Sequence, residues 1–295
     1  MNPYPSSSSR NISGIIASLV AMLLFALQDA ITKHLMESVH ITQILFVRYS
    51  FFLLFALILS HRRGGVIRAI KARRPLLQIV RGLLIVFEMG IYAYALLFLG
   101  LAPTHALFIS FPLMITALSV PLLGESVGWR RWLAVCAGFA GTLLILKPGF
   151  AVFHPAALIA LLAALLFALY NLFTRLASRS DSFETSLLYF GLVGFCTSAV
   201  SVPFYWSPLN LEQISWLLTV SGTGIVGHLL LIKSLELTPA AILQPFNYTV
   251  LVWAIIIGYL VFGEVLDSIS ILGAGIIVIS GLSIARREYL ATRSL

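Results

Sequence analysis

The chain contains one pattern twice, and this repeat strongly limits the folds that it can adopt. Residues 23–33 read LLFALQDAITK and residues 165–175 read LLFALYNLFTR, so the two align without a gap. The dipeptide Gly-Glu recurs later in each copy, at 124–125 and 263–264. Each copy holds five apolar segments, and an odd number makes the second copy enter a membrane from the opposite side. Inverted repeats of this kind are typical of secondary transporters.

The composition is that of a membrane protein. Sixty per cent of residues are hydrophobic and only 10% are charged, whereas soluble domains carry roughly 25% charged residues. A helix needs about 20 consecutive apolar residues to cross the hydrocarbon. We therefore expect an all-α integral membrane protein built from two repeats, 13–147 and 155–285. The ten predicted spans are 13–35, 41–60, 75–99, 103–123, 129–147, 155–177, 184–206, 212–235, 239–262 and 267–285.

The net charge of +8 is distributed as membrane topology requires. If the N-terminus is cytoplasmic, 15 of the 19 Lys and Arg residues fall on the cytoplasmic side, with the densest cluster at 61–74. Only Lys33 and Lys147 fall outside, while Arg48 and Arg81 lie inside predicted helices. The asymmetry predicts that both termini are cytoplasmic. We therefore expect no nucleic-acid partner, because membrane topology already explains the positive charge.

Three prolines lie well inside predicted spans, away from their ends: Pro112, Pro203 and Pro245. Proline removes a backbone hydrogen bond and kinks a helix. Pro112 and Pro245 lie in corresponding helices of the two repeats, and paired interruptions of this kind point to a substrate pathway. We expect them to act as hinges, the alternative being ordinary packing kinks.

Charged residues near the middle of three consecutive helices are the strongest candidates for a site. A charge at this depth costs at least about 2.5–3.5 kcal/mol, so it must face protein or a wet cavity. Asp29, Arg48 and Glu88 are all placed there by helical rise. In one interpretation Arg48 binds an acidic group of the substrate, and Asp29 or Glu88 meets an ammonium group or carries a proton. In the other, the three form an ion-pair network that ties the helices together.

The second repeat offers hydrogen-bonding and aromatic groups at its corresponding positions, because Asp29 aligns with Asn171. We expect a site with one charged wall and one polar aromatic wall, suited to a small amphipathic molecule. His105 and His228 are ambiguous between packing and proton transfer. The remaining candidates for the cavity wall are Tyr92, Tyr170, Asn171, His228, Gln244, Asn247 and Trp253.

Other features have structural explanations. The sequence GTGIVG at 222–227 matches a dinucleotide-binding pattern but lies within a predicted span, so close helix packing explains it better. Glu125 and Glu264 follow apolar runs, and each is expected to cap the next helix. Cys136 and Cys196 read as small packing residues rather than a disulfide.

With its ten predicted helices, paired Gly-Glu dipeptides and the stretch RRWLAVCAGFAGTLLILKPG at 130–149, the chain resembles the drug/metabolite transporter superfamily. More narrowly, it is similar to the ten-helix exporters with two EamA domains. The resemblance implies a bundle around a central cavity, alternating access and a bacterial inner membrane.

The functional expectation is a secondary transporter that exports a small amphipathic metabolite, with amino acids, including aromatic ones, as the first candidates. The alternative is an importer of riboflavin or another cofactor-like metabolite. No catalytic constellation occurs, so an enzyme is not expected, nor is a cofactor or a metal. The expected partners are the substrate and the lipid bilayer, with a monomer as the functional unit.

Overall fold

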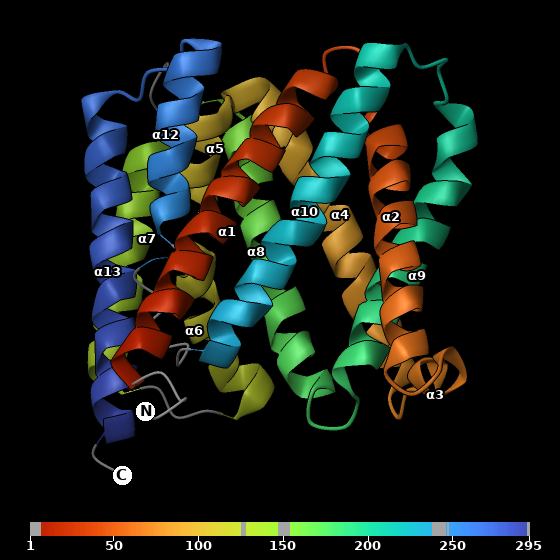
Figure 1. The fold of residues 1–295 in the computed structure, drawn as a ribbon. Helices are drawn as coiled ribbons and strands as arrows, with labels where there is room; N and C mark the ends of the chain where they lie inside the picture. The colour runs from red at the N-terminus through yellow and green to blue at the C-terminus, as the bar shows by residue number, and fades with distance from the viewer. Residues whose placement is uncertain (1–6, 125–127, 147–153, 238–245, 247, 294–295) are drawn as a thin grey trace.

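The computed structural model describes residues 7–124, 128–146, 154–237, 246 and 248–293, and the regular elements within them are helices (Figure 1). They are α1 (Ser7–Leu35), α2 (Ile41–Arg62), α3 (Val66–Ile70), α4 (Pro75–Leu99), α5 (Leu101–Phe108), α6 (Phe111–Leu123), α7 (Trp129–Leu146), α8 (Ala156–Ala177), α9 (Phe183–Ser201), the 3₁₀ helix η1 (Val202–Phe204), α10 (Leu211–Leu237), α12 (Thr249–Phe262) and α13 (Ser268–Arg293).

Seven helical segments of the described chain are long and apolar enough to cross a membrane. One of them, Leu101–Leu122, runs through α5 and α6 together. Shorter apolar helices within α7, α12 and α13 occupy three further predicted spans. The predicted all-helical membrane architecture is thus confirmed, with full spanning length established for seven of the ten predicted segments.

The packing of the helices follows the internal repeat. The most extensive contacts join α1 to α10, α4 to α8, α7 to α13 and α2 to α9. In the repeat, α1, α2, α4 and α7 correspond to α8, α9, α10 and α13. The contact of α1 with α10 is therefore equivalent to the contact of α8 with α4. The other two contacts each join a helix to its own counterpart in the other repeat. In Figure 1, α8 ends at the end of the bundle where α1 begins. The halves therefore interleave around a common centre.

Glycines allow the closest of these contacts. A Cβ on Gly141 of α7 would lie 2.7 Å from the carbonyl oxygen of Gly273 on α13. Within the GTGIVG sequence, a Cβ on Gly224 or Gly227 would meet Gln28 or Phe25 of α1 at 2.5 and 2.9 Å. Small residues thus bring α10 against α1, which confirms that GTGIVG is a packing surface.

The prediction that prolines lie inside continuous helices was wrong for two of the three. The helix is interrupted at Ile109 and Ser110, between α5 and α6. Pro112 therefore lies in the first turn of α6. Pro203 lies in the first turn of η1, beyond the end of α9. Proline is tolerated in a first turn because its missing N–H would have no helical partner there. Pro245 lies outside the described residues.

The first turn of α1, the last turn of α13 and the basic helix α3 all lie at the same end of the bundle (Figure 1). This arrangement is the one that the charge asymmetry requires, since it places the basic segment 61–74, the start of α1 and the end of α13 on one side of the membrane. The opposite end carries the connection between α1 and α2 and the start of α5.

Candidate transport site

A cavity of about 550 Å³ lies among helices of both repeats. Its volume falls within the range of roughly 300–1,000 Å³ that is usual for small-molecule sites. Most of the predicted site residues contribute to its wall. They are Asp29, Arg48, Glu88, Tyr92, Pro112, Tyr170, Asn171 and His228.

Arg48 and Glu88 are the two buried charges of this wall, each with a relative exposure of 5%. Nε and Nη2 of Arg48 have no hydrogen-bond partner among the described residues. It interacts electrostatically with Asp29, Tyr49 and Glu88, yet no ion pair within 4 Å joins Arg48 to either carboxylate in the described chain. The predicted ion-pair network is therefore not formed there. Burying a guanidinium without a partner costs free energy. Because Arg48 lies in the cavity wall, a ligand in the cavity can supply the missing partner.

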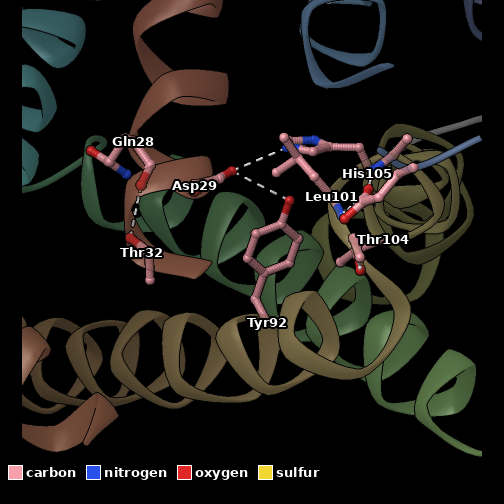
Figure 2. A network of polar contacts seen from close by, with 10 residues as sticks. Gln28, Asp29, Thr32, Tyr92, Leu101, Thr104 and His105 are labelled. Carbon is pink, nitrogen blue, oxygen red and sulfur yellow. Dashed lines mark hydrogen bonds and ion pairs between the residues drawn. The ribbon is translucent and has the colours of Figure 1, made fainter. Parts of the chain in front are cut away.

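Asp29 instead makes its contacts with α4 and α5 (Figure 2). Its Oδ2 accepts a hydrogen bond of 3.3 Å from the Tyr92 hydroxyl and lies 3.2 Å from His105 Nε2. The rings of Tyr92 and His105 are nearly perpendicular, with centroids 5.8 Å apart. His105 is buried and lines the same cavity. The three side chains thus form one cluster, which the sequence placed only as separate candidates.

Phenylalanines form much of the remaining wall, and the sequence analysis did not single them out. Phe108 lies 4.7 Å from Tyr92 and 5.3 Å from Phe167, centroid to centroid. Phe111 meets Phe167 edge-on at 4.8 Å. Helical spacing could have identified Phe167, because it lies one turn before the predicted site residue Asn171 and so on the same face of α8. The Asn171 side-chain amide donates a hydrogen bond to the Phe167 carbonyl oxygen.

His228 is held in the wall by α10 itself. Its Nδ1 lies 2.9 Å from the Gly224 carbonyl oxygen. Its ring is flanked edge-on by Phe25 at 5.0 Å and by Phe52 at 5.4 Å. These contacts resemble a satisfied packing histidine more than a proton carrier.

Four predicted residues remain, and the structure describes only Trp253 among them. Trp253 does not line the cavity, and its indole packs beside the cluster that contains Leu96 and Leu101. Gln244 and Asn247 lie outside the described residues, as does the predicted hinge Pro245.

Glu264 joins the two repeats at the end of the bundle near the start of α5. Its Oε2 accepts hydrogen bonds from the backbone N–H groups of Leu101 at 2.7 Å and Ala102 at 3.1 Å. Its Oε1 pairs with Lys33 of α1. A Cβ on Gly100 would lie 2.5 Å from this carboxylate. Glu264 therefore caps a helix, as predicted, but the helix is α5 of the other repeat.

The prediction that Glu264 caps the next helix was wrong, because Asp267 occupies that position. Its Oδ1 accepts hydrogen bonds from the backbone N–H groups of Ile269 and Ser270 at the start of α13. Glu125 lies outside the described residues.

Comparison with known proteins decides the family. The EamA-like transporter family matches residues 12–147 and again residues 154–286. The chain belongs to the EamA-like transporter family. It is a multi-pass membrane protein that transports small molecules and is not an enzyme, and the resemblance seen in its sequence is confirmed.

Relatives with different substrates match the chain over nearly its whole length. An S-adenosylmethionine uptake transporter of Rickettsia bellii is 29% identical over 98% of this chain and 97% of its own. A riboflavin transporter of Vibrio cholerae is 28% identical over 96% of each. A pseudopaline exporter of Pseudomonas aeruginosa is 25% identical over 94% of this chain and 97% of its own.

A solved structure, described as a crystal structure of a protein, has the same fold. It superposes with a TM-score of 0.62 at 19% sequence identity, over 95% of this chain and 98% of its own.

Proposed function

We propose that this EamA transporter carries a metabolite with an amino-acid head and a ring, and that S-adenosylmethionine is the best candidate. Transport would proceed by alternating access of the two inverted repeats in a bacterial inner membrane, with both termini cytoplasmic and the monomer as the unit. The observation that carries the proposal is the unpaired Arg48 guanidinium, which shares one cavity with the Glu88 carboxylate.

The cavity offers a complementary group for each part of this substrate. Arg48 presents a planar fork to the carboxylate, and Glu88 provides the opposite charge for the ammonium group. The rings of Phe108, Phe111 and Phe167 offer faces for the sulfonium cation and for the adenine ring. Relatives named as S-adenosylmethionine uptake transporters support this assignment.

Two other candidates fit fewer of these groups. An aromatic amino acid such as phenylalanine has the same head and a ring, and its export was the first expectation from the sequence, but it carries no cation near the aromatic wall. Riboflavin has neither a carboxylate nor an ammonium group, so it would leave Arg48 and Glu88 without partners. The relatives include both uptake transporters and an exporter. The family therefore gives no preference for import or export.

Counterflow tests the proposal without any driving gradient. Purified protein is reconstituted into liposomes loaded with unlabelled S-adenosylmethionine, and entry of external labelled S-adenosylmethionine is followed at equal pH on both sides. We expect saturable entry that unlabelled phenylalanine inhibits weakly and riboflavin does not inhibit. S-adenosylhomocysteine, which lacks the sulfonium charge, should compete less well than the parent compound.

A pair of variants links this activity to the cavity. Glu88→Gln should lower counterflow at least tenfold, because it removes the charge opposite the ammonium group. The matched control is Glu37→Gln, since Glu37 is exposed beyond the end of α1 and does not line the cavity. Counterflow of phenylalanine or riboflavin without that of S-adenosylmethionine would contradict the proposed substrate.

A further inference from the structure

We propose that Asp29 and His105 form a proton-binding site and that the transporter exchanges this proton for the cationic group of its substrate. The inference rests on the proposed function, because it assigns the energy source of the same transport cycle. It depends on the contact between two titratable side chains in the cavity wall, and on the charges that face them.

The Asp29 and His105 side chains are in contact with each other. His105 Nε2 lies 3.2 Å from Asp29 Oδ2, and no hydrogen bond satisfies this buried nitrogen in the described chain. Tyr92 adds one donor, its hydroxyl, to the same carboxylate oxygen. Figure 2 shows these groups converging from α1, α4 and α5. A single proton can reside on this pair, because the imidazole of histidine can both donate and accept a proton in proteins.

The surroundings of the pair couple its proton to charges in the cavity. Asp29 interacts electrostatically with Glu88 and Arg48, the two groups assigned to the substrate head. The pair also borders the aromatic wall, since His105 and Phe108 both lie on α5. The titratable and charged groups that line the cavity together with Asp29 come from α2, α4, α5, α8, α10 and the N-cap of α12. They are Arg48, Glu88, Tyr92, His105, Tyr170, His228 and Tyr248.

Competition between the proton and the substrate follows from these charges. A cation bound beside Asp29 and Glu88 favours the ionised carboxylate and so expels the proton. By linkage, a proton on the pair weakens binding of the cation by the same factor. One proton then exchanges for one singly charged S-adenosylmethionine, so the exchange is electroneutral. A gradient of one pH unit supports about a tenfold gradient of substrate at equilibrium.

Separate variants distinguish this coupling from transport itself. Liposomes with an acidic interior and an alkaline exterior should accumulate labelled S-adenosylmethionine, and a potassium–valinomycin clamp of the membrane potential should not alter the result. Asp29→Asn is expected to lower the accumulation driven by the pH gradient by a larger factor than it lowers counterflow at equal pH. His105→Gln should do the same, whereas Glu37→Gln should accumulate like the wild type.

An infrared titration keeps the inference testable even if Asp29→Asn abolishes all transport. The wild-type protein in lipid, without substrate, should show pH-dependent carboxyl or imidazole difference bands that are lost or shifted in both Asp29→Asn and His105→Gln. Identical titrations in all three proteins would overturn the site. Wild-type counterflow that ignores the pH gradient would overturn the coupling and leave the proposed substrate intact. Absence of counterflow with intact titrating bands would instead refute the proposed substrate.

Discussion

The substitution Glu264→Gln tests whether the carboxylate that joins the two repeats stabilises the fold. The side chain keeps its shape and one acceptor oxygen but loses its charge. Hydrogen bonds to a charged acceptor contribute about 1.5–3 kcal/mol each, against about 0.5–1.5 kcal/mol for neutral ones. Two backbone N–H groups and Lys33 depend on this carboxylate, so we expect a loss of about 2–4 kcal/mol.

Thermal unfolding of the purified protein in detergent measures this loss. A change of this size corresponds to a fall in Tm of roughly 5–10 °C. Lys33→Gln should cost less than Glu264→Gln, because the carboxylate then keeps both backbone N–H partners. Glu37→Gln is the matched control and should leave Tm within about 1 °C, since exposed ion pairs contribute little. If Glu264→Gln and Glu37→Gln unfold at the same temperature, the capping argument is wrong.

Three further substitutions have specific expected outcomes. Arg48→Lys should raise the counterflow KM for S-adenosylmethionine roughly 10- to 100-fold, because the ammonium group cannot replace two parallel hydrogen bonds to a carboxylate; an unchanged KM would remove Arg48 from the site. Gly194→Ala should lower the yield of folded protein in size-exclusion chromatography, because the new Cβ would lie 2.1 Å from the Tyr49 ring, and such overpacking costs about 1–3 kcal/mol. Gly100→Ala should lower Tm at least as much as Glu264→Gln, because the Gly100 φ of 90° is strained for alanine and the new Cβ would displace the Glu264 carboxylate. A wild-type Tm would contradict this account of the turn.

The helices could be predicted from the sequence because hydrocarbon imposes a simple requirement on length and polarity. The apolar runs place α1, α2, α4, α8, α9 and α10 correctly. The break between α5 and α6 was not predicted, since Pro112 is equally compatible with a kink inside a helix and with the first turn of a new one. The backbone conformation at Ile109 and Ser110, which the structure shows to interrupt the helix, distinguishes these alternatives.

The wall of the cavity could be predicted in part, because polar residues deep in an apolar helix must face protein or water. That argument identified Asp29, Arg48 and Glu88 as a set. It did not pair Asp29 with His105, since this contact depends on how α5 crosses α1. It also could not show that Glu264 reaches α5 of the other repeat, because the cap and its helix are separated by more than half of the chain.

Binding of S-adenosylmethionine to the purified protein, measured by isothermal titration calorimetry, tests the central claim most directly. We expect saturable binding by the wild type that is weakened at least tenfold in both Arg48→Lys and Glu88→Gln and is unchanged in Glu37→Gln. Equal affinity in all four proteins would show that the substrate does not occupy the cavity between Arg48 and Glu88, and would contradict the account.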